Sequence, residues 1–219
     1  AGTSTRFFAN PVPPSGAFSP AQPATTKAAE REAGSDKTHP VFEVLETWCQ
    51  DNRGRFRVNL INKIDAIGEG GEILFLISCS EIVPANVRAR FTHSLVIHAS
   101  DLPAGRGWSP HIWQVLEGSQ KLTVSLLEAE DAVDTGAIWR KTAVNLNGTE
   151  LYDEINQLLF DAEIKLIEWA CENYRTVQPI PQLAGESSYY RRRSPPDSEL
   201  DISASMDSQF NLLRICDPH

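Results

Sequence analysis

The 219-residue sequence predicts an α/β fold with a mainly parallel central sheet flanked by helices. Two kinds of segment support this class. Continuous apolar runs in "EGGEILFLISC" (69–79) and "SLVIH" (94–98) have the length and composition of buried parallel strands. Helical patterns alternate with such strands, and the longest covers 149–174, where an apolar stripe recurs at helical spacing.

The other elements follow from the same signals. The segment 109–118 has the marks of a helix: Ser109 is placed to cap it, Pro110 takes its first position, and Gly118 ends it. Apolar residues share one face of a further predicted helix, at 41–50. Periodicity also predicts short helices at 81–90 and 206–216, and strands at 56–61, 121–129 and 137–144.

Composition divides the chain into three parts. Residues 1–40 contain six of the 14 prolines and almost no apolar periodicity, so we expect an irregular arm in which only "TRFFANP" (5–11) resembles a strand. Residues 41–178 form the predicted folded domain. Residues 179–219 form a polar extension that ends in a short amphipathic helix. We expect Phe210, Leu212 and Leu213 of this helix to be exposed and able to pack on a second subunit of a homodimer or on a further C-terminal part.

Charge and cysteine content narrow the class of function. A net charge of −9 makes nucleic acid an unlikely partner, and Arg191–Arg193 is best explained as a solvated turn, with a phosphate or carboxylate site as the alternative. The four cysteines match neither a zinc spacing nor a disulfide framework, and Cys79 and Cys171 are expected to be reduced core residues, as in the cytoplasm. No apolar run is long enough to span a membrane, and no motif indicates a metal.

The stretch "HASDLPAGRGWSP" (98–110) directly follows a predicted strand. Ligands of open α/β sheets bind beyond the carboxyl ends of the strands, which is where His98 lies. Asp134 stands in a turn after a strand that we expect to neighbour this one, and histidine and aspartate together are the residue types of an acid–base pair. The helix at Ser109 would direct its N–H groups to the same edge as an anion site.

Each of these residues also has a purely structural interpretation. A histidine at a strand end is often only hydrogen-bonded structure, an aspartate before Thr-Gly is common in plain turns, and helix capping alone explains Ser109. Other catalytic classes fit less well. The chain contains no G-x-S-x-G elbow, and "GEGGE", which begins at Gly68, departs from the dinucleotide fingerprint.

The two motifs resemble a known family. "HASDLPAGRGWSP" is similar to the H-x-S-L-L-P-x-x-R-G signature of formyltransferases that use 10-formyltetrahydrofolate, and "VDTGAI" (133–138) is similar to their second signature. "FLISCSEIVP" and "RRRSPPDSELDI" resemble most closely the bacterial branch that formylates amino sugars, and the similarity covers roughly 41–217. It implies a Rossmann-like formyltransferase domain at 41–178.

The resemblance also implies roles for individual residues. His98 and Asp134 would carry catalysis: the imidazolium would stabilise the oxyanion, and the aspartate would position it and help to remove the proton. The implied donor, 10-formyltetrahydrofolate, would contact Leu76, Ile77, Ser78, Val133 and Asp134. The amine substrate would contact Ser100, Arg106, Gly107 and Trp108. No metal is implied.

One position departs from the family pattern. Many members have asparagine where this chain has Val96, which cannot donate a hydrogen bond. Ser94 is the nearest polar substitute on the same face of the strand, and Asn145 or a backbone N–H could serve instead. The resemblance as a whole implies formyl transfer from 10-formyltetrahydrofolate to a primary amine, with a nucleotide-linked amino sugar as the preferred acceptor. A methionyl-tRNA formyltransferase-like enzyme and a catalytically weakened homologue that acts as a binding protein are the alternatives.

Overall fold

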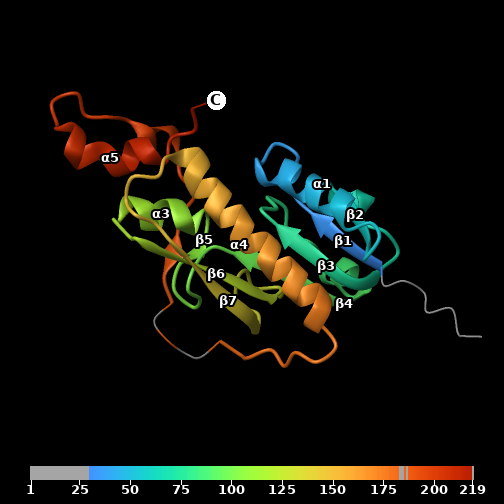
Figure 1. The fold of residues 1–219 in the computed structure, drawn as a ribbon. Coiled ribbons are helices and arrows are strands. Elements are labelled where there is room, and N and C mark those ends of the chain that lie inside the picture. Colours follow the sequence, from blue (N-terminus) through green and yellow to red (C-terminus); the bar gives the residue numbers. More distant parts are fainter. Residues whose placement is uncertain (1–29, 183–184, 186, 219) are drawn as a thin grey trace, which may run out of the picture.

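A six-stranded sheet forms the centre of the protein, whose computed structural model describes residues 30–182, 185 and 187–218 (Figure 1). The strand order is β2–β1–β3–β4–β6–β7; the first four strands are parallel, whereas β6 and β7 run antiparallel to their neighbours. The prediction of a mainly parallel α/β sheet is confirmed. The strands are β1 (Glu30–Gly34), β2 (Arg57–Ile61), β3 (Gly71–Ile77), β4 (Phe91–His98), β6 (Lys121–Glu128) and β7 (Ile138–Asn145), with a separate pair of β5 (Arg106–Gly107) and β8 (Tyr189–Tyr190).

Helices cover both faces of this sheet. The longest, α4, crosses the face that also carries α1, as Figure 1 shows. Within the described residues, no helix combines the length and apolar character needed to cross a membrane. The helices are α1 (Val41–Asp51), α2 (Ala85–Arg88), α3 (Pro110–Leu116), α4 (Tyr152–Asn173) and α5 (Met206–Arg214), with single 3₁₀ turns η1 (Ile64–Ala66) and η2 (Pro195–Ser198).

The core follows from strand alternation in β3. Ile73, Phe75 and Ile77 point into the larger core, which β3 shares with α1, α3 and α4, whereas Leu74 and Leu76 point into a smaller core under α2. All except Leu76 are fully buried, and Leu76 is 8% exposed. Because both faces are covered, the strand consists of a continuous apolar run, and burial of each large side chain contributes about 1.5–3 kcal/mol.

The first strand, Glu30–Gly34, corrects the expectation of an irregular arm for these five residues. β1 pairs with β2 on one side and β3 on the other, so it is a central strand. Its sequence, EREAG, carries charges that the structure satisfies locally. Arg31 donates to the carbonyl of Cys171 and lies over the ring of Phe56, with its guanidinium carbon 4.5 Å from the ring centroid. Glu32 accepts a hydrogen bond from the backbone N–H of Gly68. "TRFFANP" lies outside the described residues.

Two further expectations about side chains are wrong. Ser109 precedes α3, but it adopts a left-handed conformation and its side chain makes no capping hydrogen bond. Of the two cysteines expected in the core, Cys171 is buried, whereas Cys79 is exposed just beyond β3. All four cysteines of the chain are free, in agreement with the absence of a disulfide framework.

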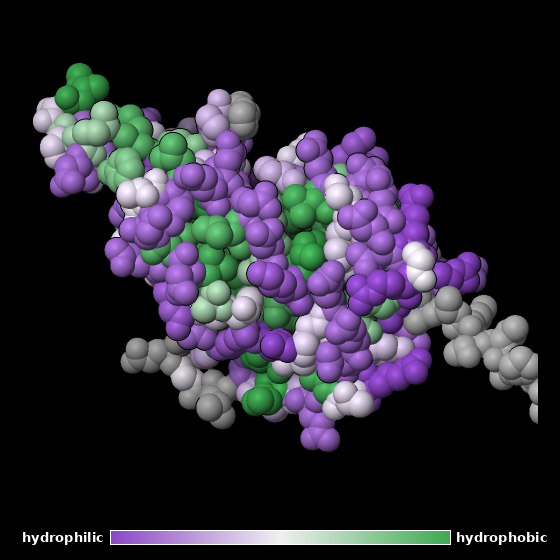
Figure 2. All heavy atoms as spheres, in the orientation of Figure 1, coloured by the Kyte–Doolittle hydropathy of each residue, from purple (hydrophilic) through white to green (hydrophobic). Residues whose placement is uncertain are grey.

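The C-terminal segment packs against the sheet domain through α5. Arg214 is buried and donates to the carbonyl and the carboxylate of Glu150, and α5 contacts α3. Phe210, Leu212 and Leu213 are half-buried rather than exposed, which corrects that expectation. Hydrophobic atoms nevertheless gather over this segment in Figure 2. The exposed large apolar side chains there are Leu200, Ile202 and Met206.

Candidate active site

The carboxyl ends of β3 and β4 bring the predicted site together. Ile77 lies opposite Ile97 in the parallel register, so Ser78 and His98 are neighbours where the two strands end. β4 and β6 are antiparallel, and the loop that leaves β6 returns across this edge carrying Asp134. The expected convergence of His98 and Asp134 is present in the structure.

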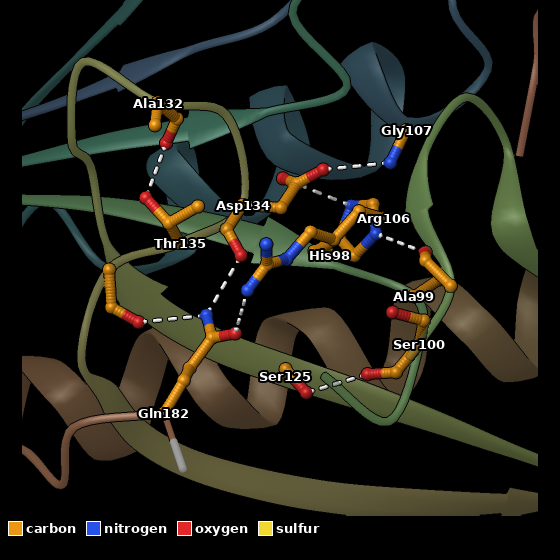
Figure 3. A network of polar contacts seen from close by, with 12 residues as sticks. His98, Ala99, Ser100, Arg106, Gly107, Ser125, Ala132, Asp134, Thr135 and Gln182 are labelled. Atoms are coloured by element: carbon orange, nitrogen blue, oxygen red, sulfur yellow. Dashed lines mark hydrogen bonds and ion pairs between the residues drawn. The ribbon is translucent and has the colours of Figure 1, made fainter. Parts of the chain in front are cut away.

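His98 is buried and contacts an acceptor at each ring nitrogen (Figure 3). Its Nδ1 lies 3.4 Å from Oδ1 of Asp134, and its Nε2 lies 2.8 Å from the carbonyl oxygen of Gly105. Carboxylate and carbonyl oxygens only accept hydrogen bonds here. A neutral imidazole can donate to only one of these two acceptors, whereas an imidazolium donates to both.

Backbone geometry holds Asp134 in this contact. Its φ of 58° lies in the left-handed region, and its second oxygen, Oδ2, accepts a hydrogen bond of 2.9 Å from the N–H of Gly107. The turn is closed by Thr135, which donates to the carbonyl of Ala132. At Gly136 a Cβ atom would lie 1.9 Å from the carbonyl oxygen of Glu128, so only glycine lets the turn approach β6 this closely.

A glutamine that the sequence did not indicate joins the loop of Asp134 to Arg106. Nε2 of Gln182 donates to the carbonyl oxygens of Asp134 and Gly136, at 2.8 and 3.0 Å. Its Oε1 accepts a bond of 2.9 Å from Nη2 of Arg106. Paired hydrogen bonds between Ile138 and Ile180 hold this segment beside β7. Figure 3 shows Gln182 between the two loops.

The four residues predicted to bind the amine have different environments. The side chain of Arg106 is bound to Gln182, and its Nε is buried without a hydrogen-bond partner among the described residues. Ser100 is buried, its carbonyl accepts from Ser125, and its own hydroxyl has no partner in that part of the chain. Gly107 holds Asp134 through its N–H. Trp108 is exposed, with the guanidinium of Arg192 over its ring.

The residues predicted to bind the donor lie on both sides of His98. Leu76 and Ile77 are buried within β3, so they offer a ligand chiefly their backbone. Ser78 has a φ of 49°, which turns the chain sharply as β3 ends. Val133, next to Asp134, is half exposed, and Ile82 on the loop after β3 is 70% exposed. The two loops at this edge therefore each present an apolar side chain to the exterior.

The two polar side chains suggested as substitutes at Val96, Ser94 and Asn145, both lie away from His98. Val96 packs with the smaller core beside Leu76. The hydroxyl of Ser94 donates to the carbonyl of Arg88, away from His98. Asn145 pairs with Lys121, four residues from the level of His98 on β6, which is about 13 Å at the usual rise per residue. The positions of Ser94 and Asn145 therefore exclude both side chains as substitutes for the asparagine.

A second histidine near the site also escaped the sequence analysis. Burial, together with the nearby His39 and His98, lowers the pKa of His111, at the start of α3, to about 4. His111 is therefore neutral at physiological pH and places no second positive charge beside His98. In the part of the chain that the structure describes, no group of histidine, cysteine and acidic residues is arranged to hold a metal.

A buried histidine–aspartate pair at the carboxyl edge of a parallel α/β sheet is typical of acid–base sites in α/β enzymes. Residues 21–170 match the family model described as formyl transferase, and the chain belongs to that family. The methionyl-tRNA formyltransferase of Rickettsia prowazekii is 30% identical over 145 residues, which are 66% of this chain and 46% of that protein. The chain thus spans about half the length of this relative.

Solved structures share the fold at lower identity. Methionyl-tRNA formyltransferase from Clostridium thermocellum has a TM-score of 0.68 and 22% identity, covering 86% of this chain and 83% of that one. HypX from Aquifex aeolicus in complex with tetrahydrofolic acid has a TM-score of 0.72 and 16% identity, covering 87% and 35%. A sugar N-formyltransferase from Shewanella sp FDAARGOS_354 has a TM-score of 0.63 and 16% identity, covering 85% and 87%. Identities this low show the fold alone.

Proposed function

We propose that this chain transfers the formyl group of 10-formyltetrahydrofolate to the primary amine of a nucleotide-linked amino sugar. The observation that carries the proposal is the buried contact between His98 and Asp134, in a chain that belongs to the formyl transferase family. The free state of all four cysteines supports a cytoplasmic location for the reaction.

His98 supplies the stabilising charge in the proposed reaction. Attack of the amine nitrogen on the formyl carbon forms the new C–N bond and places negative charge on the formyl oxygen. Nε2–H of His98 can donate to that oxygen when the oxygen takes the place of the Gly105 carbonyl, now 2.8 Å away. A single donor of this kind is worth about 3 kcal/mol, or roughly 10²–10³ in rate.

Asp134 holds the imidazolium and takes part in proton removal. Its Oδ1 faces His98, and its Oδ2 is held by the N–H of Gly107. The attacking nitrogen loses a proton towards this carboxylate. The bond from the formyl carbon to N10 of the donor breaks, and N10 leaves with a proton, so charge and atoms balance. Acid–base assistance of this type contributes about 10²–10⁴ in rate.

Exposed apolar side chains beside His98 support a folate as the formyl donor. Val133 and Ile82 stand exposed on the two loops at the edge where His98 lies. A pterin ring has two apolar faces and polar edges, so exposed aliphatic side chains and free strand-end backbone groups suit it. The complex of HypX with tetrahydrofolic acid is consistent with this assignment.

The acceptor is the less constrained part of the proposal. A net charge of −9 favours a small nucleotide-linked amine over tRNA, whose binding is largely electrostatic. Methionyl-tRNA is the second candidate, and the 30% identity to the Rickettsia prowazekii protein favours it. The presence of Val96 in place of a donor supports a third, a weakened homologue that only binds ligands.

Formyl transfer is tested by product analysis with 10-formyltetrahydrofolate and a panel of nucleotide-linked amino sugars, with methionyl-tRNA in parallel. His98→Asn should lower kcat at least 10²-fold and leave the folded state intact by circular dichroism. His93→Asn is the matched control, because His93 lies on the same strand but packs against Trp139. Product from tRNA alone would establish the second candidate, and tight folate binding without product from any amine would establish the third.

A further inference from the structure

A cavity of about 220 Å³ opens beside the candidate site, where β1, β2 and β3 end. Its floor is apolar and includes Ile61, Leu76 and Val83. Its walls carry polar groups, among them Ser35 and Lys63. None of the residues predicted from sequence to bind the amine lines it, whereas Leu76 belongs to both the cavity and the predicted donor site.

Ser35 marks the cavity as a ligand site. It follows β1 directly and is only 3% exposed, yet its hydroxyl has no hydrogen-bond partner among the described residues. Its backbone N–H bonds the carbonyl of Ile61, so the residue is fixed in place. A buried hydroxyl left without a partner costs about 1–3 kcal/mol. A ligand hydroxyl or carbonyl in the cavity would satisfy it.

The charges around the cavity favour a ring that is itself uncharged or carries an amine. Asp36 and Glu81 line it against the single cation Lys63. Hydrogen bonds from Thr38 keep the pKa of Asp36 below its ordinary value, so this carboxylate is ionised. Two carboxylates disfavour a phosphate inside the cavity. Lys63 is exposed, so it can pair with a phosphate outside.

The cavity lies within reach of His98. Cys79 lines it, and Cys79 comes one residue after Ser78, the neighbour of His98 across the two strand ends. Adjacent strands are about 4.8 Å apart, and one residue adds about 3.3 Å. An amine on a six-membered ring in the cavity would therefore approach the formyl carbon whose oxygen is held by His98. Arg106, in contrast, is engaged with Gln182 and half-buried.

We propose that this cavity binds the sugar ring of the amine acceptor, with Ser35 bonding a ring hydroxyl and Lys63 pairing with the diphosphate outside. The assignment rests on the proposed function, because it takes the acceptor to be a nucleotide-linked amino sugar. The apolar floor would contact the C–H face of the ring.

Ser35→Ala is the most direct test, because its hydroxyl bonds nothing in the described chain and its removal should not lower the melting temperature. The KM for the amino-sugar nucleotide should rise about tenfold, the value of one neutral hydrogen bond. The kcat and the KM for 10-formyltetrahydrofolate should not change. Ser119→Ala, in the turn before β6, is the control and should alter none of these values.

Alkylation of Cys79 by iodoacetamide, followed by mass spectrometry, reports on the cavity without turnover. The amino-sugar nucleotide should slow it in the wild-type protein, and less so in Ser35→Ala. Turnover of an amino-sugar nucleotide with no effect of Ser35→Ala overturns the cavity assignment and leaves the proposed function standing. Shielding without any formyl product supports the cavity but overturns the transfer, whereas neither shielding nor product overturns both. Equal shielding by a folate analogue assigns the cavity to the donor and overturns the proposal.

Discussion

Replacing Gln182 by methionine should impair formyl transfer without unfolding the protein. Methionine has a similar length but cannot make the bonds to Asp134, Gly136 and Arg106. Two neutral bonds contribute about 1 kcal/mol each, and a bond to a charged donor about 1.5–3 kcal/mol. Because Gln182 is half-buried, hydrogen bonds to water replace part of this stabilisation, and we expect a net loss of about 2 kcal/mol. This loss corresponds to a decrease of roughly 30-fold in the ratio of the native to the displaced conformation of the Asp134 turn.

The loss should be local. The kcat of Gln182→Met should fall by about 10–30-fold, and hydrogen exchange measured by mass spectrometry should speed up in the 129–137 peptide but not in β3. Gln157→Met is the matched control, since Gln157 makes one exposed bond to Asp161 on α4. Wild-type exchange in that peptide together with wild-type kcat would refute the view that Gln182 positions the turn.

Three further changes test the fold and the site. Asp134→Asn should retain a hydrogen bond from Gly107 but lose the charge facing His98, so kcat should fall about 10²–10⁴-fold while circular dichroism stays unchanged. Gly136→Ala would place a Cβ atom 1.9 Å from the carbonyl oxygen of Glu128, and the melting temperature should fall by at least about 5 °C in a calorimetric scan. Burial raises the pKa of Glu163 on α4 to about 8, so the folded state holds a proton that the unfolded state releases above about pH 4.5. The free energy of unfolding should therefore fall with rising pH between about 5 and 8, by at most about 1.4 kcal/mol per unit, and urea titrations of Glu163→Gln should lack this slope.

The sequence predicts those elements whose pattern of apolar residues matches their burial in the fold. β3 could be assigned because a strand buried on both faces is a continuous apolar run, and α4 because a helix buried on one side has apolar residues at helical spacing. β1 could not, because its core position is occupied by Arg31 and Glu32, whose charges are satisfied by partners far away in sequence. A short strand that contains three charged residues has no apolar pattern by which the sequence could reveal it.

The same reasoning separates the predictable from the unpredictable parts of the site. His98 ends β4 and Asp134 stands in the turn between β6 and β7, so the pairing of these neighbouring strands brings the two residues to one edge. Gln182 follows no strand of the central sheet and stands 48 residues after Asp134, whose carbonyl it holds. Side-chain bonds of this kind to backbone atoms leave no periodic pattern. The sequence also could not show that the Ser35 hydroxyl lacks a hydrogen-bond partner among the described residues, because this depends on which groups the fold places around it.

The polar extension is part of the site rather than an appendage to a domain at 41–178. The left-handed conformation of Asp134 costs roughly 1–3 kcal/mol, which its contacts have to offset. Gly107 supplies one of these contacts, and Gly107 is itself held by pairing of β5 with β8. Gln182 supplies another. Residues after 178 therefore support Asp134 from two directions, through Gln182 and through the β8 strand that holds Gly107. They also reach the second neighbour of His98, because the N–H of Gly105 donates to the hydroxyl of Ser188.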